Sequence, residues 1–186
     1  MAKLYLVRHA KAAAGFSEAE DPGLSEEGRD QAVDLALRLE NLGPLAIQTS
    51  PLKRAQETAA PLANRWGETA DITGTVAELP TPPDIAAAGL SARGPWLQRI
   101  AAQRYADQTG ILRAWQQGII GSLRSCRIDT VIFTHFMVIN AAVGAALNDD
   151  RLVIMQPDYC SVTVLENGGG MLALVQRGAE ATTKIL

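Results

Sequence analysis

The sequence offers little that would tie the chain to a metal, a membrane or a nucleic acid. It contains only two cysteines among 186 residues, Cys126 and Cys160, and their separation matches no metal-ligand or redox motif. We expect both to be small buried apolar residues. No apolar run approaches the roughly 18 residues of a membrane span. The formal net charge of −3, without any run of like charges, argues against binding to nucleic acid.

The remaining composition is that of an ordinary globular protein, with 47% apolar and 20% charged residues. The length fits one domain over residues 1–186, which should bury about 70% of its unfolded surface and needs no disulfide or structural metal to fold. The first expected strand begins at residue 3 without the features of a signal peptide, so we expect a cytoplasmic protein. A local cluster of arginines would still allow an anionic ligand.

The only two histidines of the chain each follow a short apolar segment. Residues 4–7 precede Arg8 and His9, and residues 129–134 precede His135. Short apolar runs with β-branched and aromatic members are typical of buried strands. Ligands of open α/β sheets bind outside the carboxyl ends of the strands. If the two strands are neighbours, both histidines lie at one edge of the sheet and can share a ligand.

Between these segments the pattern alternates between strands and helices. Ser25 is a typical N-cap, and two acids follow it in the first turn of a helix that should end at Gly43-Pro44. A strand over residues 45–49 precedes a second helix, which Ser50 as N-cap and Pro51 as first helical residue should open. This alternation predicts an α/β fold, a three-layer α/β/α sandwich with a mostly parallel central sheet and helices on both faces.

The second half of the chain begins with an irregular region over residues 70–95, where Thr81-Pro82-Pro83 excludes regular structure. So long a loop is usually functional, and we expect residues 74–113 to form a short insertion, a rim or lid over the site, with Arg93 as a substrate contact. The other expected elements are a helical stretch over 96–123 interrupted near Gly110, a helix over 136–147, and a hairpin of strands 161–165 and 171–175.

Two arginines, Arg8 and Arg54, are expected at the same edge as the two histidines and indicate phosphate chemistry. Arg54 lies in the first turn of the helix after Ser50, where a cation is unfavourable unless it and the free backbone N–H groups face an anion. A neutral imidazole can attack phosphorus, and flanking arginines would keep it unprotonated. A metal site is the weaker alternative, because metal sites favour three or more ligands and no adjacent cations. The other alternative is that these arginines are solvated surface residues without a ligand.

A leaving alkoxide also needs a proton, so a carboxylic acid should lie nearby. Glu78 stands at the head of the proline-rich loop, where it could face the crevice. Composition alone does not choose between it and the other acids of the two loops. The candidates are Glu18, Glu20, Asp21, Glu78 and Asp84.

Four segments together resemble the histidine phosphatase superfamily, also called the phosphoglycerate-mutase-like clan. Leu6-Val7-Arg8-His9-Ala10 is similar to its opening arginine-histidine signature. Residues 24–32 resemble its segment of leucine, serine or threonine, two variable residues and glycine. Residues 50–59 are similar to its serine-proline-leucine-x-arginine helix, and residues 131–135 to the strand that carries the second histidine. The combination, in family order over residues 4–147, is highly specific.

The resemblance implies a phosphohistidine mechanism that uses neither metal nor cofactor. His9 would be the nucleophile, Arg8, Arg54 and His135 the phosphate ligands, and Glu78 the proton donor. The expected activity is that of a phosphatase acting on a phosphomonoester or phosphoramidate. A phosphomutase and a phospho-ligand binding module without turnover are the alternatives. The partner would be a small phosphorylated metabolite or a phosphoprotein, with no nucleic acid or membrane involved. The oligomeric state is not predicted.

The sequence departs from the family pattern at three places. Ala10-Lys11 follow the nucleophile, as in short bacterial members similar to phosphohistidine phosphatases. Residues 12–14 are alanines where mutases carry polar residues, which argues against the mutase alternative. Phe136 replaces the glycine that usually follows the second histidine. Lys11 and Phe136 are therefore expected, with Arg93, at the substrate rim.

Overall fold

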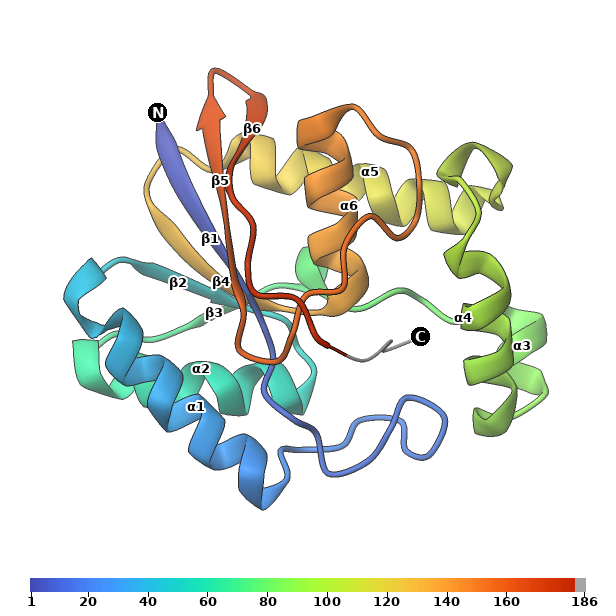
Figure 1. The fold of residues 1–186 in the computed structure, drawn as a ribbon, viewed down its shortest axis with the longest axis horizontal. Coiled ribbons are helices and arrows are strands. Elements are labelled where there is room, and N and C mark those ends of the chain that lie inside the picture. Colours follow the sequence, from blue (N-terminus) through green and yellow to red (C-terminus); the bar gives the residue numbers. More distant parts are fainter. Residues whose placement is uncertain (183–186) are drawn as a thin grey trace.

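The computed structural model describes residues 1–182 and contains a six-stranded sheet between two layers of helices (Figure 1). The strand order is β3-β2-β4-β1-β5-β6. The first four strands are parallel, and β5 runs antiparallel to both of its neighbours. The predicted three-layer α/β sandwich with a mostly parallel sheet is confirmed. The strands are β1 (Ala2–Arg8), β2 (Ala46–Thr49), β3 (Asp71–Ile72), β4 (Thr130–Thr134), β5 (Val162–Gly168) and β6 (Met171–Gln176).

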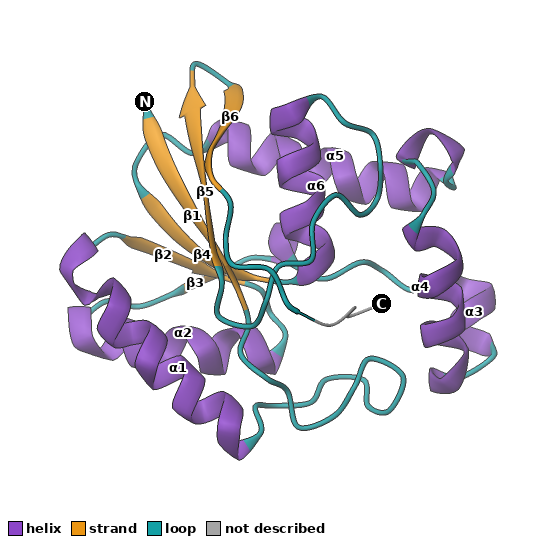
Figure 2. Ribbon diagram, viewed as in Figure 1, coloured by secondary structure: helices purple, strands orange, loops and turns teal. Residues whose placement is uncertain are grey.

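The helices divide between the two faces of the sheet. α1 and α2 cover one face, and α5 and α6 cover the other, while α3 and α4 stand apart from the strands on the side of α5 and α6 (Figure 2). Within residues 1–182, no helix combines the length and the apolar character needed to cross a bilayer. The helices are α1 (Glu26–Leu39), α2 (Lys53–Trp66), α3 (Pro83–Ala87), α4 (Arg93–Ala101), α5 (Gly110–Ser125) and α6 (Phe136–Leu147).

Each face of the sheet has its own hydrophobic core, because side chains alternate along a strand. Leu4 and Leu6 of β1 are buried beneath α5 and α6, whereas Val7 is buried beneath α1 and α2. Burial on both faces explains why the central strands are continuous apolar runs rather than alternating ones. Cys160 is buried as expected, and burial raises the pKa of its thiol to about 11, while Cys126 is only half-buried.

The predicted N-cap of the first helix is confirmed. The Oγ atom of Ser25 accepts a hydrogen bond of 3.0 Å from the backbone N–H of Gly28. A side chain at Gly28 would not fit, because its Cβ would lie 2.0 Å from the carbonyl oxygen of Lys11. The helix ends at Leu39, and a 3₁₀ turn over Glu40–Leu42 leads to the expected break at Gly43. The serine and glycine of this motif therefore hold α1 against the chain that leaves β1.

The prediction for the start of the second helix was wrong. Ser50 is not its N-cap and Pro51 is not its first residue, because α2 begins at Lys53 with Leu52 as N-cap. The Oγ atom of Ser50 contacts Nε2 of His135 at 2.7 Å and accepts from the N–H of Leu52 at 3.2 Å. Ser50 thus contacts a histidine instead of capping the helix, and α2 begins later than predicted.

The helical stretch expected over residues 96–123 is two helices with a wide gap. Between α4 and α5, the Tyr105 N–H donates to the carbonyl of Asp150 and the Gln103 carbonyl accepts from the N–H of Leu152. These bonds to a distant loop replace the helical ones, and the Tyr105 ring is buried in the core. The irregular region also contains more structure than expected, since the short strand β3 lies in it and α3 begins at Pro83, where proline is favoured.

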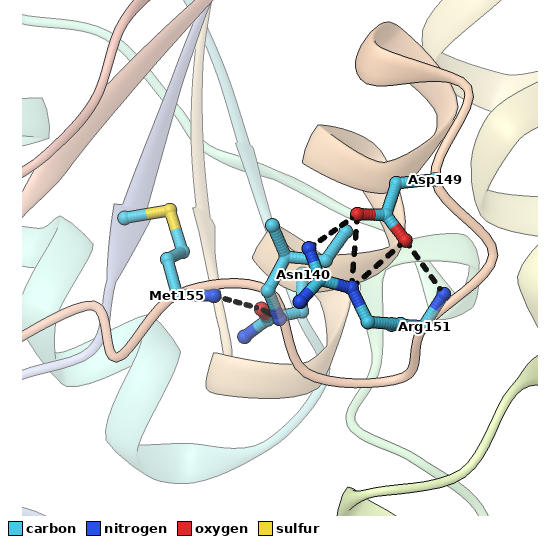
Figure 3. A network of polar contacts seen from close by, with 5 residues as sticks. Asn140, Asp149, Arg151 and Met155 are labelled. Atoms are coloured by element: carbon cyan, nitrogen blue, oxygen red, sulfur yellow. Dashed lines mark hydrogen bonds and ion pairs between the residues drawn. The ribbon is translucent and has the colours of Figure 1, made fainter.

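A buried amide holds the loop that follows α6 (Figure 3). The Oδ1 atom of Asn140 accepts hydrogen bonds from the N–H groups of Ile154, at 2.7 Å, and Met155, at 2.9 Å. Its Nδ2 atom donates to the carbonyl of Phe136 at 3.0 Å. Asp149 and Arg151 form an exposed ion pair in the same loop. This loop continues to Pro157 and Tyr159, so Asn140 helps to determine where those two residues lie.

We predict that Asn140→Leu, which keeps a similar volume, lowers the free energy of unfolding by about 2–4 kcal/mol, because it leaves the buried N–H of Met155 and the partly buried N–H of Ile154 without a partner. Urea denaturation monitored by circular dichroism measures this change. Arg151→Ala is the matched control in the same loop and should have little effect, since its ion pair is exposed. Equal destabilisation by both variants would contradict the assigned role of Asn140.

Candidate active site

The two histidines meet because their strands are neighbours. β1 pairs in parallel with β4, with Arg8 opposite Thr134, and His9 and His135 follow directly. The His9 N–H donates to the Thr134 carbonyl at 2.9 Å, and the two imidazole ring centres are 5.2 Å apart. The expectation that both histidines share one edge of the sheet is therefore confirmed.

Hydrogen bonds determine which nitrogen of His9 carries the proton. Nδ1 lies 2.8 Å from the carbonyl oxygen of Ala10, which can only accept, so Nδ1 is the protonated nitrogen. Nε2 accepts a hydrogen bond of 3.2 Å from Nε of Arg54, which can only donate. His9 is thus a neutral imidazole whose Nε2 lone pair faces an arginine.

Burial and charge keep both imidazoles neutral. Burial lowers the pKa of His9 well below its ordinary value, and the nearby charges of Arg54 and Arg8 lower it further. Burial likewise lowers the pKa of His135 well below the ordinary value, with a further contribution from His9. A base that stays unprotonated at neutral pH is what nucleophilic attack by imidazole requires.

Arg54 is a buried cation that the first turn of α2 brings to His9. Its side chain is buried, and its backbone carbonyl accepts from Oγ1 of Thr58, which in turn accepts from the N–H of Ala10. This bridge joins α2 to the end of β1. The helix start offers fewer free N–H groups than expected, because the Lys53 N–H already donates to Asp21 at 2.9 Å.

The guanidinium group of Arg8 packs against two aromatic rings. Its guanidinium carbon lies 4.2 Å from the ring centre of Tyr159 and 5.5 Å from that of Phe136. Nη1 donates to the carbonyl of Pro157 at 2.9 Å, and the buried Nε has no hydrogen-bond partner among the described residues. Burial lowers the pKa of Arg8, but a guanidinium remains charged. Arg8 is therefore a fixed cation with an unused donor close to His9.

Ser50 and Tyr159 are site residues that sequence reasoning missed. Ser50 follows β2, which pairs with β4, so its hydroxyl reaches Nε2 of His135, whose Nδ1 is buried and without a partner in the described chain. Its position at a strand end was the available signal, but the following proline favoured a helix cap. Tyr159 lies in a loop far along the chain, and no pattern around it indicates a site.

Glu78 occupies a backbone segment that is fixed from two sides. The carbonyl of Val76 accepts from Oγ1 of Thr134 at 2.8 Å, and that of Ala77 accepts from Nε1 of Trp115 at 3.0 Å. Burial raises the pKa of the Glu78 carboxyl, while the amide of Leu79 and the charge of Arg54 oppose this rise. The carboxyl group consequently keeps its proton to a higher pH than an exposed glutamate does.

The other candidate acids lie elsewhere or are exposed. Glu18 accepts from the N–H of Gly15, and Asp21 accepts from that of Lys53. Asp84 is exposed on α3. Glu20 lines the pocket, but its carboxylate is largely in solvent. Glu78 is therefore the acid whose position and proton affinity suit proton donation.

Arg8, His9, Arg54, Glu78 and Tyr159 line a pocket of about 400 Å³, whereas Ser50 and His135 are fully buried and do not line it. One wall comes from the loop after β1, which extends past the strand ends toward α3 and α4 (Figure 1). The other comes from residues 77–97, part of the predicted rim over 74–113. Arg93 and Phe136 line the pocket as expected, but Lys11 does not, because its amine pairs with Glu27. The lining residues are Arg8, His9, Ala12, Ala14, Gly15, Phe16, Ala19, Glu20, Pro22, Leu52, Arg54, Ala77, Glu78, Leu79, Thr81, Arg93, Leu97, Phe136, Met137 and Tyr159.

At the strand ends of this mostly parallel α/β sheet, His9 and the buried Arg8 and Arg54 line a pocket, and the fully buried His135 lies beside His9. Residues 4–81 match the family model of the histidine phosphatase superfamily (branch 1). The matched segment carries Arg8, His9, Arg54 and Glu78. A comparison with curated protein sequences found no match.

Solved structures share the fold over nearly the whole chain. A mycobacterial glucosyl-3-phosphoglycerate phosphatase, solved in complex with inorganic phosphate, has a TM-score of 0.72 and 23% identity, covering 97% of this chain and 98% of that one. A phosphoserine phosphatase from Entamoeba histolytica, in complex with 3-phosphoglyceric acid, has a TM-score of 0.76 and 19% identity, covering 98% of each chain. At these identities the likeness establishes the fold.

We predict that the two histidines make the protein sensitive to acid. Their pKa values are lowered in the folded state, so their contribution is fully present above the unfolded value of about 6.5 and is lost as the pH falls below it. Each histidine should add a slope of about 1.4 kcal/mol per pH unit to the free energy of unfolding below that point. The raised pKa of Glu78 acts in the opposite direction.

Urea denaturation of the wild type and of His135→Asn between pH 5 and pH 7.5 separates these contributions. The variant retains Glu78 and His9, so its slope should be smaller by the share of one histidine. An unchanged slope would show that His135 is not buried in its neutral form.

Proposed function

We propose that the protein is a phosphatase that hydrolyses a small phosphomonoester through a phosphohistidine on Nε2 of His9. The observation that carries the proposal is the state of His9, whose Nδ1–H is bound to the Ala10 carbonyl and whose Nε2 lone pair faces Arg54. A lone pair beside two buried guanidinium groups suits attack on the phosphorus of an anion that those groups bind. No metal is needed for such a step, because the arginines supply the charge that stabilises the phosphoryl oxygens.

In the first step, Nε2 of His9 forms a bond to phosphorus as the bond from phosphorus to the leaving oxygen breaks. The electron pair of that bond passes to the leaving oxygen, which takes the proton of Glu78. Arg54, whose Nε–H is bound to Nε2 in the free protein, transfers this hydrogen bond to a phosphoryl oxygen and so releases the lone pair. Arg8 offers its unused Nε–H to another oxygen.

In the second step, water attacks phosphorus and the bond to Nε2 breaks. The Glu78 carboxylate left by the first step accepts the proton of the water, as microscopic reversibility requires. The electron pair returns to Nε2, and inorganic phosphate leaves. Both roles need a carboxyl group whose pKa lies near the working pH, and burial moves the pKa of Glu78 upward from its ordinary value.

The size of the pocket favours a small phosphorylated metabolite, rather than a phosphoprotein, as the substrate. Its volume of about 400 Å³ is that of a site for a small molecule. The similar structures were solved with inorganic phosphate and 3-phosphoglyceric acid. Ala12 and Ala14 line the wall where polar residues would be expected in a mutase, which favours hydrolysis. Glu78 lines the pocket, which favours turnover over a binding module without activity.

We expect the wild type to hydrolyse an aryl phosphate in the presence of a chelator, and His9→Ala to lose this activity by at least about 1,000-fold. Phosphate release measures the activity, and circular dichroism confirms that the variant folds. Acid quenching is unsuitable for trapping the intermediate because a phosphoramidate is acid-labile, so the denatured enzyme should be examined at alkaline pH for phosphate on His9. Full activity of His9→Ala would refute the nucleophile.

Glu78→Gln should slow phosphorylation of the enzyme by an alkyl phosphate by about 100- to 10,000-fold, because the alkoxide then leaves without a proton. An aryl phosphate with an acidic phenol needs no proton, so its burst of phenol should remain while later turnover slows. Stopped-flow measurement with both substrates tests the difference. Asp84→Asn, another acid of the same region that is exposed, is the matched control. A uniform loss with both substrates would assign Glu78 a structural role only.

A further inference from the structure

Tyr159 lines the pocket, and neither step of the proposed reaction uses it. Its ring centre lies 5.9 Å from that of His9 and 4.2 Å from the guanidinium carbon of Arg8. The phenol group is also within electrostatic range of both Arg8 and Arg54. A neutral hydroxyl group therefore lies beside the nucleophile and the two cations that would bind a phosphoryl group.

The turn that carries Tyr159 has an unusual backbone conformation. Cys160 has a φ of 54°, in the left-handed region that residues with a side chain rarely occupy. Its N–H donates to the Arg8 carbonyl at 3.1 Å, and its own carbonyl accepts from Nη2 of Arg38 at 3.0 Å. The Tyr159 N–H donates to Oδ1 of Asp158 at 2.7 Å. Because strained residues that their surroundings hold in place cluster at functional sites, this turn points to a function for the residue that it positions.

The proposed first step leaves one phosphoryl oxygen without a side-chain donor. The three outer oxygens of a transferring phosphoryl group share its negative charge, and Arg8 and Arg54 bind two of them. His135, which was expected as a further ligand, is fully buried and does not line the described pocket. Ala12 and Ala14 form the wall that follows the nucleophile, and their side chains carry no donor. The third oxygen therefore needs a donor from another part of the pocket.

We propose that the hydroxyl of Tyr159 donates a hydrogen bond to this third phosphoryl oxygen and that Tyr159 is thus a catalytic residue. This inference rests on the proposed function. The other unassigned donors among the described lining side chains are Thr81 and Arg93, which belong to the rim, whereas the Tyr159 ring lies beside His9. The proton stays on the tyrosine throughout. The positive charge of the two arginines polarises the O–H bond and strengthens it as a donor.

A role limited to the aromatic ring is the alternative. The ring of Tyr159 packs on the guanidinium group of Arg8, which also lies 5.5 Å from the ring centre of Phe136. Such packing does not need the hydroxyl, because the face of a phenyl ring attracts a cation as well. Tyr159→Phe therefore removes the hydroxyl and keeps the packing, whereas Tyr159→Leu removes both.

Tyr159→Phe should lower kcat/KM by about 10- to 100-fold, the range of a hydrogen bond to a charged group. The loss should be equal for an alkyl and an aryl phosphate, because kcat/KM reports phosphorylation of the enzyme and the phosphoryl oxygens are the same in both. Tyr159→Leu should lose more activity, since Arg8 then loses the ring as well. Tyr5→Phe is the matched control, because it makes the same change in a tyrosine packed against the core under α1 and α2, and it should keep wild-type activity.

Inhibition by orthovanadate gives a second measure that does not involve a leaving group. Vanadate can adopt a five-coordinate geometry like that of the transferring phosphoryl group, so its oxygens should accept the same hydrogen bonds. Its inhibition constant should rise in Tyr159→Phe by about the factor by which kcat/KM falls. The constant should stay unchanged in Tyr5→Phe. Circular dichroism confirms that each variant folds.

The outcomes separate the role of Tyr159 from the phosphatase itself. Where turnover depends on His9, equal kcat/KM for Tyr159→Phe and the wild type would restrict Tyr159 to packing on Arg8 and overturn the inference. A loss confined to the alkyl phosphate, or an unchanged inhibition constant for vanadate, would also overturn it and leave the phosphatase intact. Absence of any turnover that depends on His9 would overturn the proposed function and the role of Tyr159 together.

Discussion

The parallel pairing of β1 with β4 is the constraint on which the site depends. It places His9 beside His135 at one edge of the sheet, and the pairing of β4 with β2 brings Ser50 to the same edge. Both strands are covered on each face by a hydrophobic core, so neither can slide without exposing apolar side chains. The positions of the reacting groups are therefore determined by packing that lies outside the pocket.

Two buried guanidinium groups beside two neutral imidazoles form an electrostatic arrangement that is complete only with an anion. Arg8 gains the Pro157 carbonyl and the ring of Tyr159, but neither supplies a negative charge. The single carboxyl group of Glu78 carries at most one negative charge and cannot neutralise both arginines. The phosphate dianion of the proposed substrate would supply the missing charge. Burial lowers the pKa of His9, and the same uncompensated positive charge lowers it further.

Sequence patterns predicted the sheet and its strand ends because a short apolar run has a local signature. They also predicted that Arg8, His9 and Arg54 lie at one edge of the sheet, because strand ends and helix starts can be located along the chain. Ser50 was misassigned because a hydroxyl before a proline has the same local signature whether it caps a helix or contacts a histidine. Tyr159 could not be predicted, because the course of its loop depends on the distant amide of Asn140. The roles of Ser50 and Tyr159 were missed because both depend on tertiary contacts, which local sequence patterns do not record.

The site divides into a base carried by strand ends and a rim carried by loops. The groups at the base are locked by backbone pairing and by burial, which suits a reaction common to many substrates. In the rim, the loop after β1 meets the start of α4. Arg93 lies over the ring of Phe16, and Gly94 approaches Ser17 so closely that a Cβ on Gly94 would lie 2.7 Å from the Ser17 hydroxyl. Substitutions in the rim can alter the leaving group that is accepted without disturbing the strands, so selectivity and chemistry can change independently in this fold.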